Sequence, residues 1–377
     1  MSLGIAGSGW VTPLGSGIEF VWDRLLRGEE PIAEQIGASP RDRTHPVFRV
    51  PEAALASLPR DPRLRRVSAI SRFAVAAGLQ ALESAQLQLN RGHPERIALI
   101  FAISNGGVTY TRRFYNDIVQ TGAQAASPLL FPETVFNAPA SHLAALLETT
   151  GATYTLVGDG AVGLPAIRMA EDVMASDAFD YCLVVGAEEV DWLLCDAYRQ
   201  WRLLRARTPL EPFRTSPRGA ILSEGAGAIL LGREGAVKID KTNPGRAYRN
   251  RREAAEILEL LLADLVDPDT GLIVASANGT FVDLAEAAAI GKIAPHAVVY
   301  TPKPAMGESV GASALWQVII AARALETGEF PPVLHPPADT PLRIAGQGPR
   351  TAKTVRAVVV SCGLNQQAAG VRLTIAP

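Results

Sequence analysis

Short runs of apolar residues recur along the chain, and each run ends at glycine, serine or another small residue. The four clearest runs cover residues 97–103, 181–185, 272–275 and 358–360. Runs of this length with such boundaries predict strands that are buried on both faces of a sheet. Between them, apolar residues recur at helical spacing, as over residues 67–85 and 161–175. The alternation of strands and helices predicts a layered α/β fold.

The composition changes near residues 232–253, where basic side chains surround the turn-like sequence Asn243-Pro244-Gly245. The basic residues are Lys241, Arg246, Arg249, Arg251 and Arg252. This stretch separates an apolar run from a helical pattern over residues 254–265, so it is the best candidate for a link between two halves. We therefore expect a first half at residues 1–235 and a second half at residues 236–377.

Composition and charge exclude several classes of protein but indicate no chemistry. The chain has 377 residues, 36 basic against 38 acidic side chains, a net charge of −2 and 48% hydrophobic residues. These values are typical of globular proteins and argue against a disordered chain or a dedicated nucleic-acid binder. No apolar run is long enough to cross a membrane, and the first residues do not look like a signal peptide, so we expect a cytoplasmic protein.

The cysteines and the glycine-rich turns give no evidence of a metal or cofactor site. Three cysteines, Cys182, Cys195 and Cys362, are too scattered for a disulfide framework or a zinc site. The turns at residues 104–107 and 225–227 fit neither a P-loop nor a dinucleotide-binding pattern. We expect neither a metal nor a cofactor.

Several segments together resemble the β-ketoacyl-acyl-carrier-protein synthases, condensing enzymes of the thiolase superfamily. The resemblance rests on residues 7–15 (GSGWVTPLG), residues 127–132 (SPLLFP) with Asn137, Pro212-Phe213, Gly219, residues 223–227 (SEGAG), Lys303, Gly307 and Gly311-Ala312. Each segment is weak evidence by itself, but all occur in the order and approximate spacing of the family. The resemblance implies the thiolase-like five-layer αβαβα fold, built from two similar halves.

The same resemblance implies a Cys-His-His catalytic set, and this chain departs from it at all three positions. The nucleophile position is Gly160, and the two histidine positions are Asn278 and Glu308. Loss of a covalent nucleophile typically removes a factor of ~10⁶ in rate. An ionised Glu308 would also repel both a malonyl carboxylate and an enolate. We therefore expect no ordinary condensation by this chain alone.

Other residues match the scaffold of the family or its substrate pocket. Glu224 and Lys303 match charged residues behind the active site of relatives, and Leu364, Thr280 and Phe131 match positions that contact substrate. Leu364 aligns with an aromatic gate, but the glycines that let the gate move are absent from residues 361–367. We expect the gate to stay fixed.

Four features allow more than one interpretation. Asp159 is either a substitute nucleophile or base, or the N-cap of the following helix. Glu308 is either a general base or a carboxylate paired with Lys303. Cys362 is either reactive or an inert thiol at the end of a strand. The basic run at residues 241–252 is either a solvated linker or a surface that docks an acidic acyl carrier protein.

The departures from the family's catalytic set indicate a member that does not condense. Relatives form twofold dimers through the N-terminal half, so we expect a dimer partner, either an active synthase subunit or a second copy of this chain. We also expect an acyl carrier protein as a partner. The leading hypothesis is a subunit similar to a polyketide chain-length factor, although such factors usually carry glutamine where this chain has Gly160. The alternatives are an acyltransferase with an atypical site at Asn278 and Glu308, and a homodimer that only binds acyl thioesters.

Overall fold

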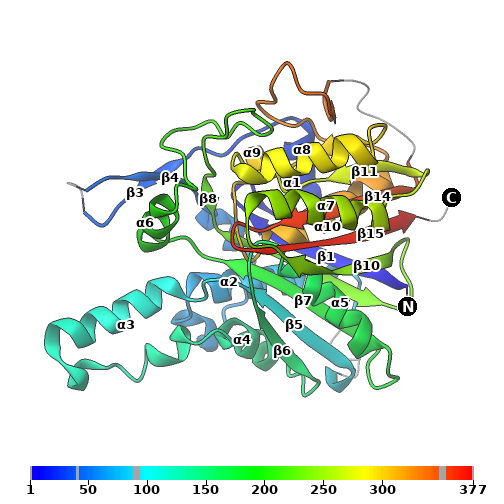
Figure 1. Ribbon diagram of the computed structural model, residues 1–377. Helices are drawn as coiled ribbons and strands as arrows, with labels where there is room; N and C mark the ends of the chain where they lie inside the picture. Colours follow the sequence, from blue (N-terminus) through cyan, green and yellow to red (C-terminus); the bar gives the residue numbers. More distant parts are fainter. Residues whose placement is uncertain (1, 40–41, 88–93, 348–353, 376–377) are drawn as a thin grey trace.

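The computed structural model describes residues 2–39, 42–87, 94–347 and 354–375 (Figure 1). Most of the strands in these residues join one long sheet, which runs in the order β13-β12-β11-β14-β15-β10-β1-β9-β7-β5-β6. A small second sheet has the order β3-β4-β8.

The long sheet consists of two repeats of the same five-strand pattern. The first repeat contains β1 (Leu3–Thr12), β5 (Ile97–Ile103), β6 (Thr153–Val157), β7 (Tyr181–Glu188) and β9 (Gly225–Gly232). The second contains β10 (Val237–Ala247), β11 (Thr270–Val274), β12 (Val298–Tyr300), β14 (Arg356–Cys362) and β15 (Gln367–Ile375). If the strands of each repeat are numbered along the chain, both repeats have the spatial order 3-2-4-5-1.

Strand directions repeat as well. In the first repeat β5 is parallel to β6 and β7, while β9 is antiparallel to β7 and β1. The second repeat has the same directions, with β11 parallel to β12 and β14, and β15 antiparallel to β14 and β10. The repeats meet where β1 pairs with β10. The structure therefore confirms a fold built from two similar halves.

Helices cover the repeats in three layers. On one outer side, α2 (Ala69–Ser84) packs on β1, β7 and β9, and α4 (Ala138–Leu147) packs on α2. On the other, α7 (Arg251–Leu265) packs on β10 and β15 and contacts α8 (Phe281–Ile293). The central helices α5 (Gly163–Met174) and α10 (Ser313–Thr327) each contact strands of both repeats. These layers are those of the thiolase-like αβαβα fold, as predicted.

Small residues in β1 allow α2 to lie close to the sheet. A Cβ atom added to Gly7 would lie 2.2 Å from the carbonyl oxygen of Ala81, and one added to Gly9 would lie 2.3 Å from that of Ala77. Any side chain at either position would push the helix away, because buried packing leaves no room for extra atoms.

Further elements lie between those of the two repeats. They are β2 (Gly15–Ser16), α1 (Ile18–Leu26), β3 (Glu34–Ile36), β4 (His45–Phe48), α3 (Val108–Thr121), α6 (Trp192–Gln200), β8 (Leu222–Ser223), α9 (Lys303–Met306) and β13 (Arg343–Ile344). Helices of the 3₁₀ type cover Glu52–Leu55, Pro62–Arg65, Pro94–Arg96, Ala123–Ala125 and Phe131–Thr134. Figure 1 shows α3 projecting from the body of the molecule at the lower left.

The strands and helices predicted from the pattern are present, with ends shifted by up to three residues. The main difference concerns residues 232–253, for which a link was predicted. There β9 ends, β10 pairs with both β1 and β15, and α7 begins at Arg251. No helix in the described part of the chain is both long enough and apolar enough to cross a membrane.

Candidate functional site

Turns carry the three positions that the resemblance assigns to catalysis, and two of these positions are in contact. Gly160 lies between β6 and α5, Asn278 follows β11, and Glu308 follows α9. Asn278 and Glu308 are in direct contact through a hydrogen bond. The turn at Gly160 also meets the second repeat, because the Ser361 hydroxyl donates to the carbonyl oxygen of Gly160 at 3.0 Å.

Both carboxylate oxygens of Glu308 are engaged by buried side chains. Oε1 lies 2.5 Å from Nζ of Lys303, and Oε2 accepts a hydrogen bond from Nδ2 of Asn278 at 2.7 Å. Lys303 is 1% exposed and Glu308 is 4% exposed, so water screens this ion pair very little. Of the two interpretations of Glu308, pairing with Lys303 is therefore the one that the structure contains.

The amide of Asn278 is also held on its oxygen side. The Thr280 hydroxyl donates to Oδ1 of Asn278 at 2.6 Å, and the same hydroxyl accepts from the backbone N–H of Val282 at the start of α8. Thr280 thus orients the amide and caps the helix. The side-chain amide of Asn278 therefore donates to Glu308 and accepts from Thr280.

Asp283 fixes the turn that carries Asn278. Its carboxylate accepts from the backbone N–H groups of Asn278 at 2.8 Å, Gly279 at 3.0 Å and Phe213 at 2.7 Å. Complete burial raises the pKa of Asp283 to about 7, against the opposing effect of these hydrogen bonds. No sequence motif indicated this role, because an acid in the first turn of a helix is ordinarily explained by the helix dipole.

Asp159 does not cap α5, so the N-cap prediction for this residue is wrong. The N-cap of α5 is Val162, with no side-chain hydrogen bond, and the Asp159 carboxylate accepts instead from the backbone N–H groups of Gly160, Leu364 and Asn365. Burial raises the pKa of Asp159, and the charge of Glu308 acts in the same direction. Asp159 thereby ties the turn after β6 to the turn between β14 and β15.

Cys362 has the environment of an inert thiol. It is 3% exposed, and its backbone N–H donates to the hydroxyl of Ser276. Burial raises the pKa of the Cys362 thiol well above its usual range, and the nearby Glu286 raises it further. A thiol that stays protonated is a poor nucleophile.

Glu286 and Glu224 are further buried carboxyl groups near the site. Oε1 of Glu286 accepts from the backbone N–H and the hydroxyl of Ser276, whereas Oε2 has no hydrogen-bond partner within the described residues. Burial raises the pKa of Glu286 to about 8. Glu224, in contrast, forms an ion pair with Arg49 at 3.1 Å and accepts from the backbone N–H of Val50.

Two adjoining pockets open next to these residues. The Asp159 pocket has a volume of about 730 Å³, and the Thr280 pocket one of about 480 Å³; Leu203, Arg251 and Phe281 line both. The other residues that line the Asp159 pocket are Ser104, Asn105, Gly158, Asp159, Leu194, Ala197, Tyr198, Trp201, Leu364 and Asn365. Asn278 and Glu308 are absent from both linings.

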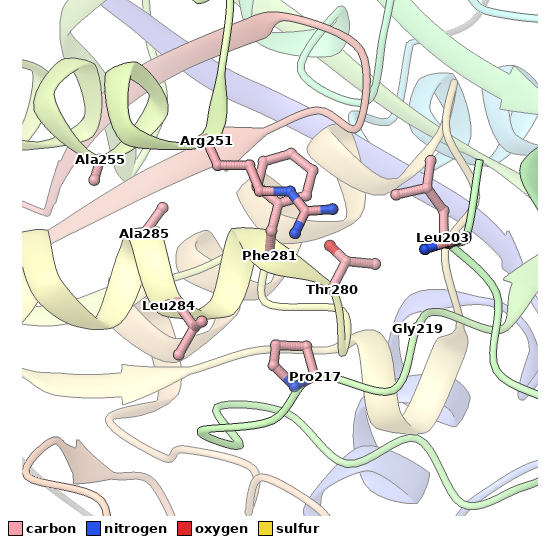
Figure 2. A pocket seen from close by; sticks show the side chains of 10 residues that line it. Leu203, Pro217, Gly219, Arg251, Ala255, Thr280, Phe281, Leu284 and Ala285 are labelled. Atoms are coloured by element: carbon pink, nitrogen blue, oxygen red, sulfur yellow. The ribbon is translucent and has the colours of Figure 1, made fainter.

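Arg251 stands where the two pockets meet. Its guanidinium carbon lies 5.2 Å from the centre of the Phe281 ring, and Figure 2 shows both side chains facing the space beside Thr280. Other members of the basic run lie in ion pairs: Lys241 with Asp264 at 2.7 Å and Arg252 with Glu256 at 3.2 Å. The run therefore does not form one continuous basic surface.

The predicted substrate contacts separate into two places. Leu364 and Thr280 each line a pocket, but Phe131 lies outside both linings. Phe131 is 54% exposed, and its ring centre is 5.8 Å from that of Phe114 on α3. The sequence did not single out Tyr198 and Trp201, two aromatic residues of the Asp159 pocket, because they sit at the end of a helix without a recognisable motif.

The outer edge of the first repeat is exposed and partly apolar. Strand β6 is the last strand of the sheet, and Tyr154 and Val157 on it are 42% and 55% exposed. Helix α4 connects β6 with the 3₁₀ helix at Phe131–Thr134 and so with α3. Exposed apolar side chains on α3, on the 3₁₀ helix and on the residues that flank this 3₁₀ helix are Tyr115, Val119, Leu129, Phe131, Val135 and Phe136. We call these side chains, with Tyr154 and Val157, the β6 face.

The pockets leave room for a ligand, and the groups at the predicted catalytic positions are missing or engaged. Gly160 has no side chain, the Cys362 thiol is held protonated, and Glu308 is committed to Lys303 and Asn278. Among the described residues, no group of three or more histidine, cysteine or acidic side chains could hold a metal ion.

Comparisons with known proteins agree with this fold. The description "Beta-ketoacyl synthase, N-terminal domain" matches residues 2–236, and "Beta-ketoacyl synthase, C-terminal domain" matches residues 234–336. A 3-oxoacyl-[acyl-carrier-protein] synthase 2 from Staphylococcus aureus is 21% identical over 361 residues, which cover 88% of this chain and 89% of the relative.

Solved structures share the fold over nearly their whole length. The ishigamide ketosynthase/chain length factor has a TM-score of 0.88 and 20% identity, covering 100% of this chain and 99% of that one. A ketosynthase in complex with its chain length factor from Xenorhabdus doucetiae has a TM-score of 0.83 and 19% identity, covering 100% and 98% of the two chains.

Proposed function

Because this chain belongs to the β-ketoacyl synthase family, we propose that it is a non-condensing member that works as the partner of an active synthase. In this role it resembles a chain-length factor of fatty-acid or polyketide synthesis. It completes the dimer and helps to shape the space in which the acyl chain grows. The division into halves at residues 1–235 and 236–377 and the cytoplasmic location are part of the proposal.

The observation that carries this proposal is the closed network at the catalytic positions. Condensation needs a nucleophile that takes the acyl group and polar groups that stabilise the developing enolate. Here Gly160 supplies no nucleophile, and Asn278 donates to Glu308 at 2.7 Å rather than into a pocket. The carboxylate of Glu308 brings negative charge to the place where condensation would develop it.

The β6 face supports a partner of the same fold. The edge of β6 presents unpaired backbone groups within the described chain, and exposed apolar side chains surround it. Such an edge is suited to pairing with a strand from another chain. Two of the solved structures with this fold are ketosynthases named together with a chain length factor, which favours a heterodimer over a homodimer.

An acyl carrier protein is the second partner that we propose. Arg251 at the junction of the two pockets places a cation beside an entrance of suitable size for a thioester-bearing arm. A carrier protein with an acidic surface would be attracted by this charge during encounter. The relative from Staphylococcus aureus acts on acyl-carrier-protein substrates by its name.

Co-purification tests the proposal. The chain is co-expressed with a synthase that carries the Cys-His-His set, and the mass of the purified complex is measured by light scattering. We expect a 1:1 heterodimer that Tyr154→Asp on β6 weakens at least tenfold. Leu260→Asp is the matched control, because Leu260 is 54% exposed on α7, in the outer layer of the second repeat. A homodimer that ignores active synthases would contradict the proposal.

The open pockets favour a second candidate function, a homodimer that binds acyl thioesters without converting them. This candidate predicts thermal stabilisation by acyl-pantetheine and no product in mass spectrometry. An enzyme with an atypical site would instead show turnover that Glu308→Ala abolishes and Cys362→Ala preserves. The engagement of both oxygens of Glu308 counts against this enzyme.

A further inference from the structure

Three backbone N–H groups converge on the carboxylate of Asp159. Oδ1 accepts from Gly160 at 2.7 Å and from Leu364 at 3.1 Å, and Oδ2 accepts from Asn365 at 2.6 Å. The donors come from two segments that are about 200 residues apart in the sequence. We call these three N–H groups the amide hole. Converging backbone N–H groups of this kind bind anions and polarise carbonyl oxygens.

The chain is shaped to admit a carboxylate at this point. A Cβ atom added to Gly363 would lie 1.9 Å from Oδ2 of Asp159, so any other residue there would collide with the carboxylate. Gly160 is less confined, since an added Cβ would meet only the Cα atom of Gly363, at 3.3 Å. Gly363 therefore leaves the space that the Asp159 carboxylate fills.

Contacts that do not involve the Asp159 carboxylate also hold the amide hole in place. The backbone N–H of Gly363 donates to the carbonyl oxygen of Gln367 at 2.7 Å, and the hydroxyl of Tyr248 donates to the carbonyl oxygen of Gly363. On the other segment, Ser361 binds the carbonyl oxygen of Gly160. The hole should therefore persist when the side chain of Asp159 is shortened.

The Asp159 carboxylate fills the amide hole at the wall of an open pocket. Asp159 is 8% exposed, and Asp159, Leu364 and Asn365 all line the Asp159 pocket of about 730 Å³. A ligand in this pocket could reach the N–H groups if the carboxylate were absent. While the carboxylate is present, it satisfies all three donors and places negative charge where a ligand oxygen would bind.

We propose that the amide hole is an anion-binding site whose occupant is the chain's own Asp159, and that this carboxylate excludes the carboxylate or acyl carbonyl oxygen of a ligand. Asp159 is thus an internal plug. This inference goes beyond the proposed partner function, since it holds whether or not the chain pairs with a synthase.

Chemical rescue of Asp159→Gly tests the plug. The substitution removes the CH₂–COO⁻ group, which has the same four heavy atoms as acetate, and we expect Tm to fall by about 5 °C. Sodium acetate should then restore stability in a saturable way. With a dissociation constant of about 10 mM, about 100 mM acetate raises Tm by about 2 °C beyond the effect of sodium chloride at equal ionic strength.

The controls separate a built site from a general salt effect. Acetamide, the neutral analogue of acetate, should not rescue Asp159→Gly, and acetate should not shift the wild-type protein, in which the hole is filled. The matched variant is Asp61→Gly, because Asp61 also accepts a backbone N–H, from Arg63 at 2.7 Å, but at an exposed turn. Acetate should leave Asp61→Gly unchanged.

Two outcomes would overturn the inference: an equal response of Asp159→Gly to acetate and chloride, or an equal response of both variants to acetate. If Asp159→Gly does not fold in chloride, its refolding yield in acetate replaces Tm as the measurement, with the same expectations. Neither measurement depends on the synthase partner, so failure of the heterodimer and failure of the plug are distinguishable.

Discussion

Neutralising Glu308 should destabilise the protein strongly, because its partner Lys303 is buried with it. The two charged atoms lie 2.5 Å apart. At an effective dielectric constant of about 20, their attraction is about 7 kcal/mol before the cost of removing both ions from water. Glu308→Gln retains an acceptor for Asn278 but leaves Lys303 buried without a counter-charge, and breaking a buried pair in this way typically costs about 3–5 kcal/mol.

The double variant separates the ion pair from packing. Lys303→Met together with Glu308→Gln removes both charges and keeps similar volumes, so we expect its stability to lie within about 2 kcal/mol of the wild type. For a chain of this length, the single substitution Glu308→Gln should lower Tm by about 4–6 °C. Urea unfolding of the wild type, the two single variants and the double variant gives the coupling energy directly.

An exposed ion pair provides the control. Arg252 and Glu256 form an i,i+4 pair on α7 with side chains 90% and 62% exposed, so Glu256→Gln should cost less than about 0.5 kcal/mol. A Glu308→Gln effect as small as that of Glu256→Gln would refute the reasoning. The same conclusion would follow if Lys303→Met added its full cost to that of Glu308→Gln.

Three further predictions follow from the buried groups. Glu286→Gln should flatten the pH dependence of stability. Burial raises the pKa of Glu286 to about 8, so the folded protein keeps a proton that the unfolded chain releases above about pH 4, and the stability of the wild type falls as pH rises from 4 to 8. When Tm is measured from pH 5 to 8, the variant should gain up to about 2 °C per pH unit relative to the wild type. The three buried cysteines should not react with a thiol reagent such as DTNB in the native protein, and all three should react in denaturant; fast labelling of even one native thiol would contradict the burial. Gly363→Ala should lower stability by about 1–3 kcal/mol through its clash with Asp159, and calorimetry should show no such cost when Asp159→Gly is already present.

Local pattern was enough to predict most strands and helices of this fold. Residues 97–103 form β5 with the predicted bounds, and the helix predicted at residues 67–85 is α2 at Ala69–Ser84. These elements have continuous or periodic apolar sequences, which local reasoning detects well. The five-layer arrangement came from the resemblance, because the pairing of β1 with β10 joins residues more than 230 positions apart and leaves no local signal.

The candidate site was predictable only where family motifs supplied positions. The resemblance located Asn278 and Glu308, and the structure shows the hydrogen bond between them. It did not indicate the bonding of Asp159, since the donors Leu364 and Asn365 are 205 and 206 residues away and backbone N–H groups carry no sequence signature. The N-cap interpretation failed because it considered only the helix that follows Asp159. The division between residues 235 and 236 stays a prediction.

The way polar groups are bonded in the site and left uncovered on the surface supports the partner role that we propose. In an enzyme, polar groups of the site are held ready to bond to the transition state. Keeping them without partners in the free enzyme lowers the stability of the fold. Here the corresponding groups are saturated by the chain itself: Glu308 by Lys303 and Asn278, and Asp159 by three amides. On the β6 face, in contrast, an edge strand and exposed apolar side chains remain uncovered within the described residues. These exposed groups lie on the outside of the molecule, where another chain can contact them, whereas Glu308 and Asp159 are bonded within the chain; this contrast supports the partner role that we propose.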